Sequence, residues 1–250
     1  MSLPQNLKNA GKKILNQIYF PFLIKPAIRL FQTARLNVTT PAEAQALSEN
    51  FYYGPKFRPL QINLRAAQQK DEIIKLMTAV KNLAPKIVLE IGTATGGTLF
   101  FWTQMAPPDA LIISLDLPFG HFGAGYISSK IKLYQSLARG EQKIELLRVD
   151  SHRATTKEKL AALLAGRKID FLFIDGDHSY LGAKQDFDDY KEFVRPGGLI
   201  ALHDIARTSA ESESKVEILW DEIKNQYPSE EYINDDQQGW AGIGVIHFNN

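Results

Sequence analysis

The sequence predicts an α/β fold: a doubly wound, mainly parallel sheet of seven strands with helices on both faces, preceded by a helical N-terminal extension. Three observations support this prediction. From residue 59 onward, short apolar runs alternate with helical patterns, as in right-handed crossovers between parallel strands. The first apolar run, 87–91, leads into a glycine-rich turn that opens the next helix. A last strand-like run, 239–248, is expected beside its predecessor, in either direction.

The predicted elements follow one another in order along the chain. Residues 68–83 carry apolar side chains at helical spacing and stop before Pro85, which predicts a helix. Further helical patterns lie at 157–164, 181–194 and 216–227. The apolar runs with the length and boundaries of buried strands lie at 87–91, 111–117, 144–149, 171–174 and 199–202.

The composition is that of a soluble globular chain of 250 residues, with 44% hydrophobic and 23% charged residues. Cysteine is absent, which excludes disulfides, zinc–thiolate sites and cysteine nucleophiles. A reducing compartment is therefore permitted, and the cytoplasm is the expected location.

The N-terminal part of the chain is basic. Six Lys or Arg residues and no acidic residue precede Glu43, so a net charge of +1 for the whole chain leaves the remainder at −5. We therefore divide the chain into a basic helical extension, 1–58, and a main domain, 59–250. The longest apolar run of the extension, 18–24, is far shorter than the roughly 20 residues that span a bilayer. The extension also lacks the pattern of a cleavable secretory signal.

We expect one or two short helices in the extension, interrupted at Pro21 and Pro26. They would cover the main domain or a second subunit of a homo-oligomer. A peripheral contact with a membrane surface is the alternative.

Polar side chains follow five consecutive predicted strands, where the carboxyl ends of parallel strands meet and ligands bind. Carboxylates gathered at one edge repel one another unless hydrogen bonds, a metal or protonation relieve them, so the pattern predicts a ligand site. The turn itself reads E-x-G-x-x-x-G-G, and Ala94 replaces the middle glycine of the dinucleotide fingerprint, which argues against an NAD-dependent oxidoreductase. The residues are Glu90 and Gly92, then Asp116, then Asp150 and Ser151, then Asp175, Asp177 and His178, then His203 and Asp204.

Four segments of the chain resemble the class I S-adenosylmethionine-dependent methyltransferases. They read VLEIGTATGGT, SLDLPFGHFGAGY, LLRVDSH and DFLFIDGDHSYLGAKQDFDDYKEFVRPGGLIALHD, and the resemblance covers about 59–248. It lies within a subgroup of cephalosporin-hydroxylase-like proteins and small-molecule O-methyltransferases. The resemblance implies a Rossmann-like fold that binds S-adenosylmethionine and methylates a small hydroxylated acceptor, such as a sugar or a natural-product intermediate.

The resemblance also implies roles for single residues around the cofactor. Asp116 would accept hydrogen bonds from both ribose hydroxyls, and the pair 150–151 would lie at the adenine. Taken alone, the glycines could simply form a tight turn and the carboxylates could cap helices. The implied cofactor residues are Glu90, Gly92, Thr93, Gly96, Gly97, Asp116, Leu117, Asp150, Ser151 and Asp175.

The resemblance places the chemistry near Asp175. In metal-dependent catechol and caffeoyl-coenzyme A O-methyltransferases, a lysine base stands three residues after a metal-binding aspartate, and His178 has that offset here. His178 is therefore the implied base, with Asp175 as its catalytic partner; a loop-orienting role is the alternative. Asp175, His203 and Asp204 would bind Mg²⁺ or another divalent cation, although His203 departs from the Asp–Asn pattern of that family.

We expect simpler roles for one loop, three carboxylates and two histidines. The segment 118–130 is either a closing loop in which His121 or Tyr126 touches a ligand or a surface Ω-loop. The carboxylates at 186, 188 and 189 are expected on a solvated helix face. His152 and His247 are expected to be structural.

One class of partner is excluded, and one alternative function stays open. The net acidic main domain argues against nucleic acid as a partner. A non-catalytic S-adenosylmethionine-binding or assembly protein with the same fold is the alternative function.

Overall fold

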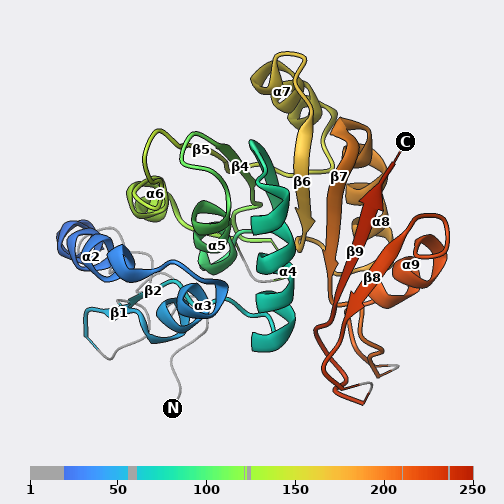
Figure 1. Ribbon diagram of the computed structural model, residues 1–250, viewed down its shortest axis with the longest axis horizontal. Coiled ribbons are helices and arrows are strands. Elements are labelled where there is room, and N and C mark those ends of the chain that lie inside the picture. The colour runs from blue at the N-terminus through green and yellow to red at the C-terminus, as the bar shows by residue number, and fades with distance from the viewer. Residues whose placement is uncertain are drawn as a thin grey trace, which may run out of the picture.

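A twisted sheet forms the centre of the computed structural model, which describes residues 20–55, 61–120, 122, 125–209, 211–235 and 237–249 (Figure 1). Within these residues the main sheet has seven strands in the order β5-β4-β3-β6-β7-β9-β8. β3 to β7 run parallel, and β9 lies antiparallel between β7 and β8. The fold prediction is confirmed. The strands are β3 (Ile87–Ile91), β4 (Leu111–Leu115), β5 (Lys143–Leu147), β6 (Ile169–Ile174), β7 (Val194–His203), β8 (Ser229–Tyr232) and β9 (Ile243–Phe248).

Helices cover both faces of this sheet. Alternate residues of each central strand point to opposite sides, so Val88 joins one apolar cluster and Leu89 the other. The first cluster includes α4 (Lys70–Leu83), α5 (Gly97–Met105) and α6 (Ile131–Gln135). The second includes α7 (Ala154–Leu164), α8 (Tyr180–Tyr190) and α9 (Val216–Ile223).

The described part of the N-terminal extension packs on the first cluster. It comprises α2 (Phe20–Ala34), α3 (Pro41–Asn50) and β1 (Tyr52–Tyr53), and β1 pairs antiparallel with β2 (Ile62–Asn63) at the start of the main domain. The ring of Phe31 lies 5.0 Å from that of Phe100 in α5, edge to face. The expected boundary between 58 and 59 falls among residues 56–60, outside the described residues, so the division into domains stays a prediction.

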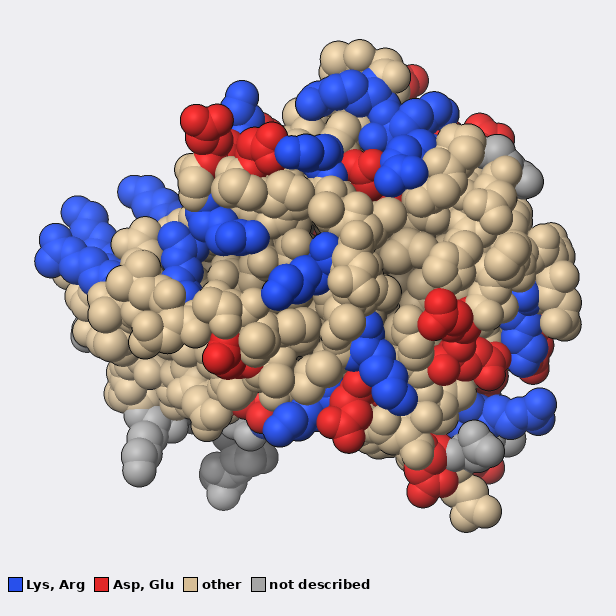
Figure 2. Space-filling view, in the orientation of Figure 1, with Lys and Arg blue, Asp and Glu red and all other residues tan. Residues whose placement is uncertain are grey.

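The predicted helix break at Pro26 is wrong, because Pro26 lies inside α2. Pro21 is the second residue of α2, and the residues before Phe20 lie outside the described part of the chain, so the break predicted at Pro21 stays a prediction. A proline costs the helix one backbone hydrogen bond, but the inner face of α2 buries Ala27 and Phe31 completely, and this packing holds the helix together. None of the helices in the described ranges has the length and apolar character needed to cross a bilayer. Lys and Arg side chains gather at the α2 end of the face shown in Figure 2.

The edge strand β8 was not predicted as a separate element. Its sequence, SEEY, is polar and mostly exposed, so it has no apolar run to indicate a strand. It forms because β9 offers it a ladder partner, with Glu230 opposite Val245.

Candidate active site

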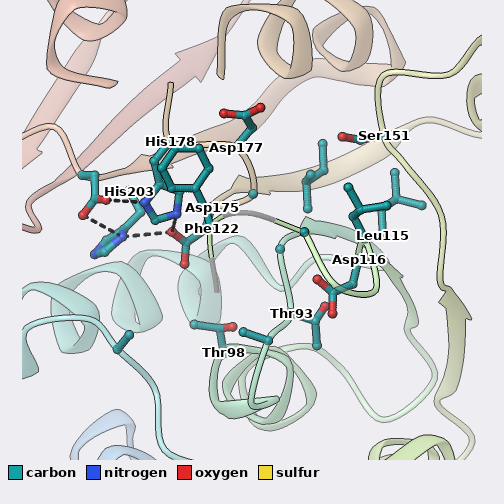
Figure 3. Close-up of a pocket in the computed structure, with 18 of the residues that line it drawn as sticks. Thr93, Thr98, Leu115, Asp116, Phe122, Ser151, Asp175, Asp177, His178 and His203 are labelled. Carbon is teal, nitrogen blue, oxygen red and sulfur yellow. Dashed lines mark hydrogen bonds and ion pairs between the residues drawn. The ribbon is translucent and has the colours of Figure 1, made fainter. Parts of the chain in front are cut away.

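A cavity of about 580 Å³ opens where the central strands end, and all five predicted strand ends contribute to its lining (Figure 3). The structure therefore brings together residues that are up to 112 positions apart in the sequence, from Gly92 to Asp204. Glu90 and Gly96 are the two predicted site residues that do not line it. Those that do are Gly92, Thr93, Gly97, Asp116, Leu117, Asp150, Ser151, Asp175, Asp177, His178, His203 and Asp204.

The glycine-rich turn forms the floor of the cavity. Gly92 has a φ of 92°, and a Cβ atom there would overlap the carbonyl oxygen of Asp175 on the neighbouring strand, so only glycine fits. Ala94 has a φ of 43°, so alanine here adopts the left-handed conformation that the usual glycine would take. Gly97 is the first residue of α5 and lines the cavity, so the positive N-terminal end of that helix faces the cavity.

Glu90 lies beneath this turn, completely buried. Trp102 donates its indole N–H to Oε1 at 2.8 Å, and the hydroxyl of Thr93 donates to Oε2 at 2.6 Å. Burial raises the pKa of Glu90 to about 7, against the effect of these hydrogen bonds. Glu90 therefore supports the turn from behind, and its direct contact with a cofactor stays a prediction.

Asp116 reaches the cavity from the end of β4 and is 7% exposed. Its Oδ2 accepts a hydrogen bond of 2.9 Å from the backbone N–H of Tyr126. Burial raises the pKa of Asp116, while backbone N–H groups of Tyr126, Thr93 and Ala94 act in the opposite direction. These donors fix the orientation of the carboxylate, and its contact with the ribose stays a prediction.

One part of the prediction for segment 118–130, the contact of Tyr126 with a ligand, is wrong, and the choice between a closing loop and an Ω-loop stays open. Tyr126 is buried and does not line the cavity, and its ring packs against that of Tyr134 at 4.9 Å. The hydroxyl of Tyr134 in turn donates to the carbonyl of Ala94 at 2.8 Å. His121, the other candidate, lies outside the described residues. Phe122 lines the cavity instead, and its ring stacks on the imidazole of His178 at 5.1 Å and 7°.

Asp150 and Ser151 line the cavity beyond β5, at the opposite end from β7. Oδ1 of Asp150 accepts from the backbone N–H of His152 at 3.0 Å, and Tyr190 donates its hydroxyl to the carbonyl of Ser151 at 2.6 Å. The loop is thus fixed before any ligand binds.

The solvated position expected for Asp186 is wrong. Ala183, Asp186, Phe187 and Tyr190 share the buried face of α8 at helical spacing, so the carboxylate is completely buried. Nε2 of His152 lies 3.2 Å from its Oδ1, and this contact raises the pKa of His152 to about 9 although burial opposes it.

The other structural histidine also has an acidic partner. Nε2 of His247 lies 2.8 Å from Oε1 of Glu230, and both side chains are about half exposed. This pair lies on β8 and β9, outside the cavity lining.

Asp175, His178, His203 and Asp204 form a hydrogen-bonded group, here called the His–Asp cluster (Figure 3). Nδ1 of His178 lies 2.7 Å from Oδ2 of Asp204, and its Nε2 lies 3.5 Å from Oδ1 of Asp175. Nδ1 of His203 lies 3.0 Å from Oδ1 of Asp175 and 3.2 Å from Oδ1 of Asp204. Each imidazole therefore bridges the same two carboxylates.

The electrostatics of the cluster follow from this bridging. Burial alone would lower the pKa of His203, but the carboxylates of Asp175 and Asp204 raise it to about 9. The pKa of His178 is raised in the same way, against burial, by its bond to Asp204. Burial would raise the pKa of Asp204, but the two imidazoles lower it. Asp204 also has a φ of 63°, a strained backbone conformation of the kind found at functional sites.

The predicted metal ligands lie together but are not arranged as a metal site. Nδ1 of His203 sits between the carboxylates of Asp175 and Asp204 and would have to leave before a cation could bind both. Asp177 accepts from the backbone N–H of Ser179 at 2.9 Å, and its carboxylate points away from the cluster in Figure 3. Across the described residues, no three His, Cys, Asp or Glu side chains are placed to hold a metal ion. The donor set as it stands does not fit a divalent cation.

Several lining residues were not predicted from the sequence. Gln68 donates its amide N–H to Oδ2 of Asp175 at 2.7 Å, from the residues just before α4. Trp240 reaches the cavity from the loop before β9, and His152 from the loop before α7. The signal for Trp240 was present as a lone aromatic residue beside Gly239 in a turn, but nothing in the sequence places that turn beside Asp204.

Comparisons with known proteins agree with this geometry. Residues 89–205 match the family model described as a methyltransferase domain. The fold is similar to the O-methyltransferase TomG from Streptomyces achromogenes, solved with S-adenosylmethionine, at a TM-score of 0.54 and 14% identity over 88% of this chain and 95% of that one. It is also similar to the Bacillus cereus O-methyltransferase solved with S-adenosylhomocysteine, at a TM-score of 0.53 and 14% identity over 95% and 97% of the two chains. Residues 89–205 are thus identified as a methyltransferase domain, and the chain has the Rossmann-like fold of solved O-methyltransferases.

Proposed function

We propose that this chain transfers a methyl group from S-adenosylmethionine to a hydroxyl oxygen of a small molecule. The cavity that joins the glycine-rich turn to the His–Asp cluster is the observation that carries the proposal. The turn, Asp116 and the pair Asp150–Ser151 fit the cofactor as a continuous wall along β3, β4 and β5. When bound, S-adenosylmethionine supplies an electrophilic methyl group for in-line attack by the acceptor oxygen.

His178 is the proposed base. Asp204 lies against Nδ1 of its ring at 2.7 Å, which favours a proton on Nδ1 and leaves Nε2 to accept the proton of the acceptor hydroxyl. Phe122 covers one face of the ring, which limits water near it. Asp175 lies beside Nε2 and is itself held by Gln68 and His203, so it can orient the acceptor and stabilise His178 once protonated.

No step of this proposal passes through a metal. The imidazole of His203 supplies positive charge between the two carboxylates, and the neutral ring of His178 donates its Nδ1–H to Asp204. The predicted use of Mg²⁺ or another divalent cation stays a separate question, which exhaustive chelation followed by addition of Mg²⁺ or Mn²⁺ answers. Activity that disappears with the chelator and returns with the ion would show that His203 moves aside for a cation.

The test of the proposed base combines calorimetry with methyl transfer from labelled donor to a panel of hydroxylated acceptors. The change His178→Gln should lower kcat by about 10²- to 10⁴-fold and leave the Kd for S-adenosylhomocysteine within about 3-fold of the parent value. His247→Gln is the matched control, because this histidine also pairs with a carboxylate but lies outside the cavity. A parent protein that does not bind S-adenosylhomocysteine refutes the proposed function. A parent that binds it but transfers no methyl group supports the non-catalytic alternative.

We also propose that the extension 1–58 covers the main domain through α2 and offers its outer face to a second surface. Phe22 is 78% exposed on this face, and Lys25 and Arg29 are exposed beside it. Co-sedimentation with anionic and with neutral vesicles, together with the molecular mass in solution, distinguishes a membrane surface from a second copy of the chain. A monomer that binds neither kind of vesicle refutes this role.

A further inference from the structure

Trp240 is an exposed aromatic side chain in the wall of the cavity. The chain has three tryptophans, of which Trp102 and Trp220 are buried and Trp240 is 49% exposed. Large aromatic side chains in ligand sites commonly supply an apolar surface for a ring. An indole left half exposed at the edge of a polar cavity therefore points to a ligand that covers it.

The backbone places Trp240 at the acceptor end of the cavity. The N–H of Ala206 donates to the carbonyl of Ala241 at 2.8 Å, and that of Ile205 donates to the carbonyl of Gly242 at 3.3 Å. The loop that carries the indole thus runs alongside the residues that follow the His–Asp cluster. The cofactor wall lies along β3, β4 and β5, whereas Trp240 belongs to the side of β7 and β9. It is therefore in position to touch the acceptor rather than the adenosine.

A buried carboxylate anchors this loop. Glu72 of α4 is completely buried, and its Oε2 accepts from the N–H of Gly242 at 2.9 Å. Its Oε1 accepts from the side-chain amide of Gln238 at 2.8 Å and from the N–H of Asn234 at 3.2 Å. The same amide of Gln238 donates to the carbonyl of Trp240 at 2.7 Å. A carboxylate is costly to bury without such donors, so the loop and Glu72 fix one another before a ligand arrives.

The remaining walls at this end restrict the charge of the acceptor. Three carboxylates, Asp175, Asp177 and Asp204, line the cavity there against two imidazoles, of which His178 is neutral when it acts as the base. The wall therefore keeps an acidic excess that repels an anionic acceptor. Hydroxyl groups, in contrast, can donate hydrogen bonds to carboxylates. The ring of Phe122, stacked on His178, adds apolar surface.

We propose that Trp240 is the stacking surface of the acceptor subsite, and that the acceptor is an uncharged ring that carries hydroxyl groups. Glu72 is a positioning residue that acts through the loop of Trp240. The inference rests on the proposed methyl transfer and narrows its substrate class. A sugar ring and a phenolic ring share this chemistry, because each has an apolar face and hydroxyl donors at its edge.

Binding can be tested without knowing the acceptor, because acrylamide quenches exposed tryptophan and Trp240 is the exposed one of the three. The probes are methyl β-glucoside, catechol and glucose 6-phosphate, added to protein saturated with S-adenosylhomocysteine. One of the two uncharged rings should protect Trp240 from quenching, at concentrations roughly 10-fold lower than the phosphorylated sugar needs. The ring that protects identifies the class. Protection by neither uncharged ring, or better protection by glucose 6-phosphate, overturns the proposal.

Kinetics then separate stacking from a structural role. Trp240→Ala should raise KM for the methylated ring by roughly 10- to 100-fold, the range of one base-sized stacking contact, whereas Trp240→Phe should recover most of the loss. The Kd for S-adenosylhomocysteine should not change in either variant. Ile218→Ala is the matched control, because Ile218 is 47% exposed but lies on α9, outside the cavity lining. Equal effects of the Trp240→Ala and Ile218→Ala changes overturn the stacking role.

The positioning role of Glu72 has its own variant. Glu72→Gln keeps the size of the side chain but turns one acceptor into a donor that faces N–H groups, so the loop should loosen. It should raise KM with kcat and cofactor affinity unchanged, and it should make Trp240 easier to quench. A variant with the KM and quenching of the parent refutes the positioning role, and if it does not fold, the Trp240 variants still decide the stacking role. Failure of the proposed function would appear separately, as absence of S-adenosylhomocysteine binding in the parent protein.

Discussion

Glu90 offers the sharpest test of how the turn is supported. The change Glu90→Gln keeps the size and shape of the side chain and removes its ability to ionise. The amide oxygen can accept from Trp102 as before, and the amide N–H₂ can donate to the hydroxyl of Thr93. Thr93 can then donate to Ser114, which lies 2.6 Å away. These hydrogen bonds therefore survive in a consistent direction, and the hydroxyl of Thr98, which also bonds to Glu90, can act as donor or acceptor.

The magnitude follows from the shifted pKa. Burial raises the pKa of Glu90 from 4.5 to about 7. Between these two values the unfolded chain loses its proton while the folded chain keeps it, so rising pH favours unfolding. A shift of this size corresponds to about 3 kcal/mol, at 1.36 kcal/mol for each pH unit. The parent should therefore lose about 3 kcal/mol of stability at this site between pH 4.5 and 7, and no more above pH 7.

The assay is urea denaturation of parent and variant at intervals from pH 4.5 to 8.5. The difference between the two free energies of unfolding cancels the titration of all other groups. It should rise in favour of Glu90→Gln by about 3 kcal/mol across this range, while the Kd for S-adenosylhomocysteine stays near the parent value. A difference independent of pH, or a variant less stable at pH 8, refutes the buried, proton-binding role. A large loss of cofactor affinity would instead favour the direct contact predicted from the sequence.

Three further changes test the walls of the cavity. Gly92→Ala should destabilise the fold by about 3 kcal/mol or more in urea denaturation, because its Cβ would overlap the carbonyl of Asp175 at a positive φ; a loss below about 1 kcal/mol contradicts this. Asp116→Asn should weaken S-adenosylhomocysteine binding by roughly 10- to 100-fold in calorimetry with little change in Tm, and unchanged affinity would remove Asp116 from the cofactor site. Asp186→Asn should return the pKa of His152 from about 9 toward its ordinary value in an NMR titration. The stability that comes from the raised pKa of His152 is present below pH 6.5 and lost as pH rises through about 9. The free energy of unfolding of the parent should therefore fall toward that of the variant in this window. A difference between the two free energies that does not change with pH contradicts the pairing.

The parts of the fold that could be predicted are those whose signal is local. β3 and β4 are buried on both faces, so each is an apolar run interrupted by a single polar residue, Glu90 or Ser114, and followed by a turn. β8 is a polar edge strand that exists only because β9 pairs with it, and its sequence contains no such run. The opposite error occurs in α2, where Pro26 is a strong local signal for a helix break that tertiary packing overrides.

The residues of the candidate site also divide into those with a local signal and those placed by tertiary contacts. Residues that directly follow a strand were predictable, because topology alone brings the strand ends to one edge of the sheet. Phe122, Gln68 and Trp240 reach the cavity from loops whose path depends on contacts far along the chain, such as that between Glu72 and Gly242. The apolar spacing of α8 did indicate that the carboxylate at 186 faces inward, but three acidic residues within four positions suggested solvent instead.

Carboxylates collected at one edge of a sheet must be relieved of their mutual repulsion, and this chain does so with its own groups. Glu90 is relieved by burial that raises its pKa, and Asp116 by backbone N–H donors. Asp175 and Asp204 are relieved by the imidazoles of His178 and His203. Hydrogen bonds, protonation and a metal were the three solutions open from the sequence, and the first two already account for these four carboxylates. The cavity is therefore organised before a ligand binds, which is the condition under which fixed groups stabilise a transition state most effectively.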